Sequence, residues 1–166
     1  MNPQDRLQPS LLDRLIEEAP AGDNMVLSKQ QLRQAVMRDL AWLLNAVTSL
    51  TLEEAAQPQL ANSVLNYGLP PTAGQLASRI DVNLLERQIH DAIVRFEPRI
   101  LADSLLVTAR EFDDVLATHN VVAFEIRGFL WAQPVPLELL LRTQIDLEAG
   151  LVEVTDSAGT VRSQSR

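Results

Sequence analysis

The sequence has no cysteine, few aromatic residues and no long apolar run. The lack of cysteine excludes a disulfide framework, a thiolate nucleophile and a cysteine-based metal site. No stretch approaches the roughly 20 apolar residues that span a bilayer, and the N-terminus lacks the basic start and apolar core of a signal peptide. We therefore expect a soluble, cytoplasmic protein without direct membrane insertion.

Positive charge is scarce relative to negative charge. Fourteen Lys and Arg stand against 22 Asp and Glu in 166 residues, which gives a formal net charge of −8. This charge repels phosphate backbones and anionic lipid headgroups, so nucleic acid is not an expected partner. The length and the 46% hydrophobic content suit one domain. We expect an amphipathic arm and linker over residues 1–24, a single α+β domain over 25–156 and a flexible polar tail over 157–166.

A short amphipathic arm is predicted near the N-terminus, before Pro20 and Gly22 break the chain. Its apolar stripe needs a cover, which either this domain or another protein can supply. Helical spacing within residues 8–18 places on this stripe Leu11, Leu12, Leu15 and Ile16.

Two longer helices follow the arm. The first is predicted to begin after the N-cap Ser28 and to run to about Asn45. The second covers about 81–96, where apolar residues recur on one stripe. Between them, the prolines and glycines of 48–74 predict a short helix, an irregular segment and a tight turn at 66–70.

After the last helix the hydrophobic period changes from 3.6 to 2, which is typical of strands. The strongest alternation runs over 137–148 and predicts one buried and one exposed face. We expect an α+β fold, in which N-terminal helices pack on a mostly antiparallel C-terminal β-sheet. The predicted strands cover 104–110, 120–131, 137–147 and 151–155.

A long alternating strand at the edge of a sheet can accept a foreign strand through its free backbone groups. Arg142 and Gln144 occupy outward positions of the strongest strand pattern, so they are candidate partner contacts. A proline at Gln144 is expected to impair such pairing, provided that the edge of this strand is free.

The tripeptide Glu97-Pro98-Arg99 lies where the last helix meets the first strand. Pro98 has no N–H group and biases Glu97 away from helical dihedrals, so this elbow presents a carboxylate and a guanidinium from a fixed backbone. Arg99 either pairs with a local acid inside the fold or interlocks with the charges of a partner. If the charges form a surface pair, Arg99→Ala is expected to leave the domain folded.

The sequence shows no convergent set of residues for metal-dependent or nucleophilic catalysis. His90 and His119 are isolated, and neither paired histidines nor a clustered carboxylate loop predicts a metal site. No Gly-x-Ser-x-Gly context and no glycine-rich phosphate loop is present. We therefore expect no metal and no cofactor.

A glycosidase is the alternative enzyme class. Glu97 could act with Glu111, Asp113 or Asp114, because glycosidases need two carboxylates on either side of a sugar cleft. Carboxylate pairs are common in an acidic protein, however, and the seven aromatic residues leave few stacking surfaces for sugars. A lysozyme-like peptidoglycan hydrolase therefore remains the alternative to a binding protein.

An ordered set of segments resembles the TssE family, the wedge proteins of the bacterial type VI secretion baseplate. This family is similar to the lysozyme-like wedge family of contractile phage tails. The most specific feature is Asn66-Tyr67-Gly68 followed by Glu-Pro-Arg after a helix. The resemblance spans most of the chain, through Leu11 to Leu15, Arg38 to Asn45, Ser63 to Pro70, Phe96 to Ile100 and Leu137 to Val154.

The resemblance implies a structural role without catalysis, at the membrane-docked baseplate in the cytoplasm of a Gram-negative bacterium. Implied partners are the baseplate subunits TssF, TssG and TssK and the sheath proteins TssB and TssC, with the Hcp tube as a further candidate. It places Glu97, Pro98 and Arg99 in the core bundle that ties wedge subunits together. The C-terminal strands would be the template for the first sheath ring, and the N-terminal arm would face a partner.

Overall fold

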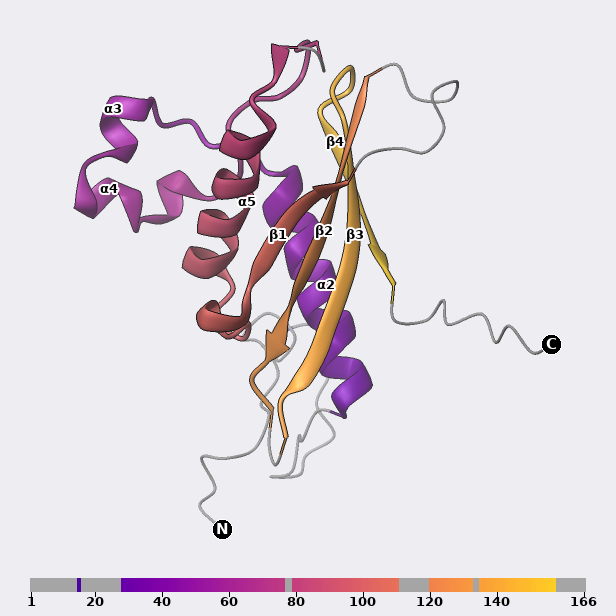
Figure 1. Ribbon diagram of the computed structural model, residues 1–166. Helices are drawn as coiled ribbons and strands as arrows, with labels where there is room; N and C mark the ends of the chain where they lie inside the picture. Colours follow the sequence, from indigo (N-terminus) through magenta and orange to yellow (C-terminus); the bar gives the residue numbers. More distant parts are fainter. Residues whose placement is uncertain (1–14, 16–27, 77–78, 111–119, 133–134, 158–166) are drawn as a thin grey trace, which may run out of the picture.

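The structure is a computed structural model that describes residues 15, 28–76, 79–110, 120–132 and 135–157 (Figure 1). The predicted arm, with Leu11, Leu12 and Ile16, lies outside these residues, and Leu15 is exposed. The part that the structure describes consists of N-terminal helices followed by a sheet, so the α+β prediction is confirmed.

Helix α2, Lys29–Asn45, begins where its capping residue predicts. Ser28 has extended backbone angles, and its Oγ accepts a hydrogen bond from the N–H of Gln31 at 3.2 Å. The Gln31 side chain accepts one in return from the N–H of Ser28 at 2.9 Å. This reciprocal capping box satisfies two N–H groups that the helix itself leaves without acceptors.

Helix α5, Val82–Phe96, also follows the sequence prediction. Asp81 accepts a hydrogen bond from the N–H of Leu84 at 3.0 Å and so caps the first turn. The helix ends at Phe96, because Pro98 disfavours helical angles in Glu97, the residue before it.

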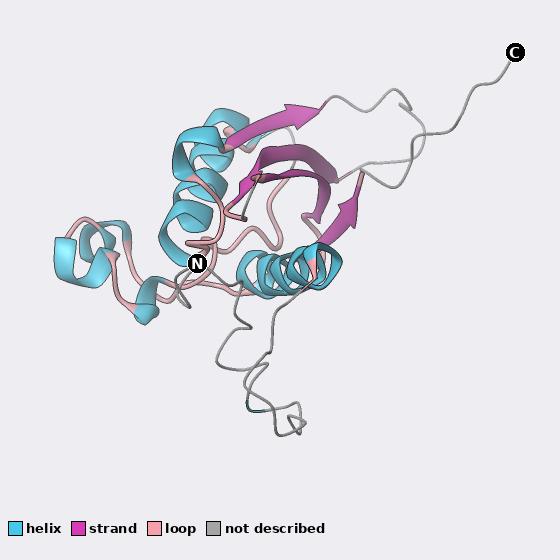
Figure 2. Cartoon of the chain, turned by 90° about the horizontal axis from the view of Figure 1, so that it is seen from below, coloured by secondary structure: helices cyan, strands magenta, loops and turns pink. Residues whose placement is uncertain are grey.

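Between these helices the chain forms a small lobe that projects from the body of the molecule (Figures 1 and 2). It contains α3, Leu52–Ala55, α4, Pro58–Ala61, and the 3-10 helix η2, Val64–Asn66. The tight turn predicted at 66–70 is instead the end of η2 followed by a bend at Gly68, after which the chain returns to the body through a parallel bridge between Val47 and Leu69.

A four-stranded antiparallel sheet follows the short 3-10 helix η4, Ala102–Ser104. This helix replaces the start of the first predicted strand. The strands are paired in sequence order and comprise β1, Leu106–Arg110, β2, Val121–Leu130, β3, Leu137–Asp146, and β4, Leu151–Asp156. Because β3 pairs with both neighbours, Gln144 does not lie on an edge strand. A proline there would therefore break the interior of the sheet rather than report on a free edge.

The core lies between one face of the sheet and the helices α2 and α5 (Figures 1 and 2). Alternate residues of β2 and β3, including Phe124 and Leu141, are completely buried against the helices. On the opposite face, no helix of the described residues covers the sheet.

The outer edge of β4 is closed at one residue by a side chain of α2. Asn45 Oδ1 accepts a hydrogen bond from the N–H of Val152 at 2.9 Å, and Asn45 Nδ2 donates to the Val152 carbonyl at 2.8 Å. The amide thus reproduces the two bonds that a neighbouring strand would make, and it blocks strand addition at this point.

We expect Asn45→Ala to lower the free energy of unfolding by about 1 to 2 kcal/mol, because two backbone groups of β4 lose their partner. Urea denaturation measures this loss. Asn62→Ala is the matched control, since Asn62 Nδ2 donates only to the Pro58 carbonyl, at 3.2 Å, on the surface. Equal stability of the two variants would mean that the Asn45 clip contributes nothing.

Candidate functional site

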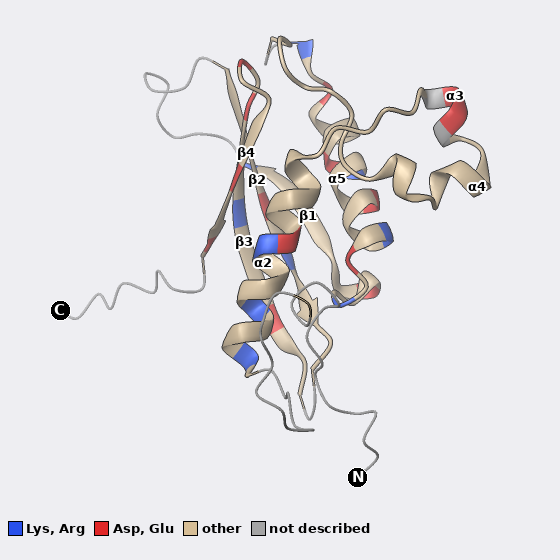
Figure 3. Ribbon diagram, turned by 180° about the vertical axis from the view of Figure 1, so that it is seen from behind, with Lys and Arg blue, Asp and Glu red and all other residues tan. Residues whose placement is uncertain are grey.

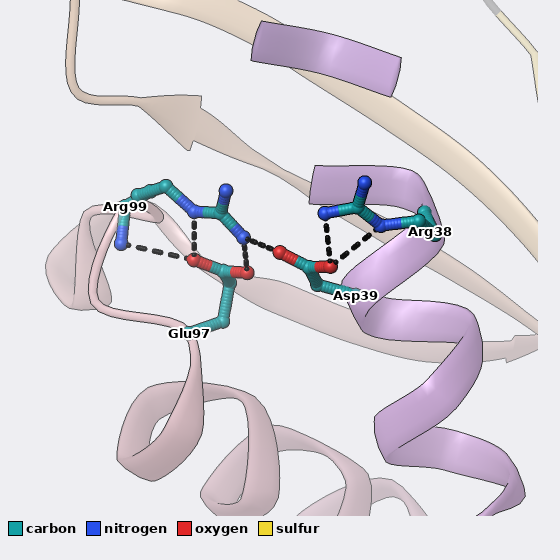
Figure 4. Close-up of polar contacts among 4 residues, drawn as sticks. All are labelled: Arg38, Asp39, Glu97 and Arg99. Atoms are coloured by element: carbon teal, nitrogen blue, oxygen red, sulfur yellow. Dashed lines mark hydrogen bonds and ion pairs between the residues drawn. The ribbon is translucent and has the colours of Figure 1, made fainter. Parts of the chain in front are cut away.

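The elbow after α5 turns its carboxylate inward. Glu97 is only 3% exposed, and Arg99 holds both of its oxygens. Arg99 Nε donates to Glu97 Oε1 at 2.7 Å and Nη2 donates to Oε2 at 2.5 Å, while the N–H of Arg99 donates to Oε1 at 3.2 Å (Figure 4). This bidentate pair is the strong form of a charge-assisted hydrogen bond.

Helix α2 supplies a second acid to the same guanidinium. Arg99 Nη2 donates to Asp39 Oδ2 at 2.5 Å. The other oxygen of Asp39 accepts hydrogen bonds from Arg38 Nε at 3.0 Å and Arg38 Nη2 at 2.9 Å. Glu97, Arg99, Asp39 and Arg38 therefore form a row of alternating charges, the elbow network, which joins α2 to the end of α5 (Figure 4).

Aromatic side chains lie beside the elbow network. The guanidinium carbon of Arg38 lies 4.9 Å from the ring centroid of Trp42, which is 49% exposed. Tyr67 packs edge-on against Phe96, with ring centroids 5.3 Å apart. Burial, Asp39 and Glu97 together raise the pKa of the Tyr67 hydroxyl, because each disfavours its anion.

The electrostatics of the network keep its charges in place. Burial acts to lower the pKa of Arg99, but the hydrogen bonds and charges of Glu97, and then of Asp39, outweigh burial and raise it. Arg99 therefore stays cationic, and both oxygens of Glu97 accept N–H groups. Such an arrangement positions charges and locks two elements together.

The interpretation in which Arg99 meets a local acid agrees with this geometry. The premise that the charges form a surface pair is wrong, because Glu97 is buried and the Arg99 side chain is only 25% exposed. Pro98 is exposed at the elbow. Arg142 and Gln144 are exposed on the sheet face opposite the helices, so they do not join this network.

Of the two histidines and three further acids considered for catalysis, only His90 lies among the described residues. His90 Nδ1 lies 3.2 Å from the carboxylate of the next residue, Asp91, on the surface of α5. Within the ranges that the structure describes, no group of three or more His, Cys, Asp or Glu could hold a metal ion. The remaining candidates, His119, Glu111, Asp113 and Asp114, lie outside the described residues.

Sequence reasoning did not pair Arg99 with Asp39 or place Arg38, Trp42 and Tyr67 around it. A signal was available for Asp39, which sits among the apolar residues that α2 buries. An acid on a buried stripe is costly unless a cation meets it. The partner itself lies 60 residues further along the chain, and no local pattern identifies it.

No helix in the described parts of the chain is long and apolar enough to cross a membrane. Neither a curated protein nor a solved structure matches the chain. A family model described as baseplate wedge protein gp25 matches residues 30–135, which include α2 from its second residue, α5 and the whole elbow network. Because this range is more than half of the 166 residues, the chain belongs to the family of baseplate wedge protein gp25.

Proposed function

We propose that this protein is a structural subunit of a type VI secretion baseplate, where it joins wedge subunits and seats the contractile sheath. The family match over residues 30–135 carries the proposal. The proposed wedge domain covers residues 25–156, and the proposed partners are TssF, TssG, TssK and the sheath proteins TssB and TssC, which surround the Hcp tube. The proposed location is the cytoplasmic, membrane-docked baseplate of a Gram-negative bacterium.

The elbow network supports a role in which the residues around it are held in position for contact with a partner. The bidentate pair and Asp39 hold Arg99 to α2, so the backbone at Pro98 is fixed before any partner arrives. Arg38, Trp42 and Pro98 reach the surface beside it. Tryptophan and arginine are the residues on which binding energy concentrates at interfaces. We assign contact with a neighbouring wedge subunit to this elbow patch, defined as Arg38, Trp42, Pro98 and Arg99.

The sheet supports a role in seating the sheath through its outer strands. Only β1 and β4 can accept a further strand, since β2 and β3 are paired on both sides. Each outer strand is closed at one point: Asn45 binds Val152, and Glu86 Oε1 accepts the N–H of Ala109 at 2.5 Å. Strand addition is therefore confined to the remainder of these two edges. Arg142 and Gln144 would contact the partner with side chains, and the arm residues Leu11, Leu12, Leu15 and Ile16 are proposed as a further anchor.

The proposed role is not catalytic. Both oxygens of Glu97 are bound by Arg99, so this residue is not poised as the proton donor of a glycosidase. A lysozyme-like hydrolase would have to use other carboxylates, and release of sugars from peptidoglycan by the purified protein would favour it.

The elbow patch can be tested with exposed residues that leave the buried pair intact. We expect Trp42→Ala to reduce capture of TssF, TssG and TssK in a pull-down by about tenfold or more, since an interface hot spot contributes at least about 2 kcal/mol. Leu84→Ala is the matched control, because Leu84 is an exposed apolar residue of α5 outside the patch. Sheaths labelled through TssB are counted in the same cells, and thermal melts check that both variants fold.

Normal capture and normal sheath numbers in Trp42→Ala would remove the patch from the interface. Failure of the wild-type protein to capture any of the three wedge subunits would overturn the proposed function itself.

A further inference from the structure

The uncovered face of the sheet has an unusual centre for a protein of net charge −8. Three arginines surround one carboxylate there, and we call these four residues the arginine face: Arg110, Glu125, Arg127 and Arg142. Arg110 Nη2 donates to Glu125 Oε2 from β1, and Arg127 Nε donates to Glu125 Oε1 from two positions along β2. Arg142 is the cross-strand neighbour of Glu125 on β3. Figure 3 shows basic and acidic positions on the strands of the sheet.

Glu125 is buried although its face carries no covering helix in the described part of the chain. It is only 5% exposed, whereas the Arg110 and Arg127 side chains are each more than half exposed. Burial acts to raise the pKa of Glu125, but hydrogen bonds from Arg110 and Arg127 lower it overall. The carboxylate therefore stays ionised beneath its cations, and it fixes two guanidinium groups on the sheet surface.

The arginines have more hydrogen-bond donors than Glu125 can occupy. Each guanidinium carries five N–H groups, and Arg110 and Arg127 each use one of theirs on Glu125. The Arg142 guanidinium has no polar partner within the residues that the structure describes. Three guanidinium groups surround the one carboxylate of Glu125, so the centre of this face is locally cationic, whereas Glu138 and Glu153 place acids at its periphery. The two guanidinium groups that Glu125 holds would lose little freedom on binding.

Apolar side chains flank this charge. Leu106 on β1 is the cross-strand neighbour of Arg127, and Phe129 follows Arg127 by two positions on β2, so both share its face. Both are among the exposed large hydrophobic residues. A positively charged centre beside exposed leucine and phenylalanine suits a polypeptide that carries acids and an apolar residue, rather than a uniform polyanion.

We propose that the arginine face binds an acidic segment of a partner protein, whose carboxylates pair with Arg127 and Arg142 while an apolar side chain packs on Leu106 and Phe129. The inference rests on the proposed assembly function, and it adds the chemistry that the partner must present to the sheet. It concerns a face of the sheet, so it is independent of strand addition at the edges. Exposed Leu106 and Phe129, with the acid Glu138 directly across from Phe129, distinguish this face from the continuous basic surface that nucleic acid and anionic membranes require.

A binding measurement with a defined probe tests this inference. The probe is a short, fluorescently labelled peptide of Asp and Glu with two leucines, and anisotropy is measured with the full chain. We expect Arg142→Gln to weaken binding by about tenfold, as for loss of one charge-assisted contact. The same peptide with Gln and Asn in place of its acids should bind no better to the wild type than the acidic peptide binds to this variant.

Arg87→Gln is the matched control, because Arg87 is an exposed arginine on α5 that donates only to the Asn83 carbonyl. It removes the same charge from the helical side of the molecule and should leave affinity unchanged. Equal binding by Arg142→Gln and the wild type would overturn the inference. Equally tight binding of a single-stranded oligonucleotide of the same charge would also overturn it, because the face would then recognise any polyanion.

An assembly measurement separates this inference from the proposed function. Thr108→Glu places a new acid directly across from Glu125 without removing an arginine, so it should fold and still repel an acidic segment. We expect this variant to capture wedge subunits normally and to lose most sheaths. Normal sheaths in Thr108→Glu, with capture lost in Trp42→Ala, would overturn the arginine face as an assembly contact and leave the proposed function intact. Failed capture by the wild type would overturn the function, while the peptide measurement would still decide the chemistry of the face.

Discussion

Arg99→Ala is expected to lower the free energy of unfolding by about 3 kcal/mol or more. The substitution leaves Glu97, which is 3% exposed, as a buried carboxylate without its cation. Asp39 loses the same partner on its Oδ2 atom. Removal of one member of a buried ion pair costs more than the pair contributes, because the remaining charge stays away from water. Guanidinium chloride denaturation, followed by circular dichroism, measures the change.

Two comparisons identify the buried charge as the cause. Arg99→Lys keeps a cation but loses the planar fork, so an intermediate loss is expected. Arg87→Ala removes an exposed arginine of α5 and should stay within about 0.5 kcal/mol of the wild type. If Arg99→Ala were as stable as Arg87→Ala, the Glu97 pair would have no role in the fold, and the elbow would serve a partner alone.

This expectation changes how assembly experiments on the elbow should be interpreted. Loss of sheaths in Arg99→Ala would follow from destabilisation as readily as from a lost contact, because the pair is internal. Trp42→Ala separates the two causes, since its ring is half exposed, lies beside the Arg38 guanidinium and takes no part in the Glu97–Arg99 pair.

Gly68→Ala is expected to destabilise the protein by at least about 3 kcal/mol. Gly68 has a φ of +114°, which L-residues rarely adopt. A Cβ at this position would lie 2.4 Å from the carbonyl oxygen and 2.6 Å from the carbonyl carbon of Ala46, and this backbone cannot move freely. The N–H of Leu69 donates to that same oxygen at 2.9 Å, and the Leu69 carbonyl accepts the N–H of Thr48 at 3.0 Å. Urea denaturation measures the loss.

Gly74→Ala is the control for backbone strain alone. Its φ is +78°, but nothing lies within 4 Å of an added Cβ, so the expected cost is about 1 kcal/mol. The difference between the two variants reports the clash with Ala46. Equal stability would mean that the segment at Gly68 can shift away from the end of α2 without loss. Tyr67 directly precedes Gly68. The edge-on contact of Tyr67 with Phe96 should therefore be lost in Gly68→Ala.

Much of the local structure could be predicted from neighbouring residues. The N-cap residues Ser28 and Asp81 predict the starts of α2 and α5, and Pro98 predicts the end of α5. The alternation after Leu137 predicts which face of β3 is buried. These features depend on hydrogen bonds and side-chain periods within a few residues, so short stretches of sequence contain their cause. Two boundaries were wrong, at η4 and at the segment around Gly68, because there contacts with distant chain determine the backbone.

The candidate site was predicted only in part. Glu97 and Arg99 were identified as a charged elbow, and one of the two interpretations left open was pairing within the fold. The sequence could not name Asp39 as the second acid, since a pairing over 60 residues depends on how α2 and α5 lie together. Nor could it show that β3 is an interior strand. For that reason a proline at Gln144 does not test a free edge.

By itself, then, the sequence determined the fold class, the helix caps, the strand faces and a resemblance to baseplate wedge proteins that the family match confirms. Only the tertiary structure decided where charges are buried and which strand edges are closed. The elbow network, the Asn45 clip 107 residues from Val152 and the arginine face each join residues from separate elements. Local periodicity sets the face on which a side chain points, but its partner is set by the packing of the whole chain.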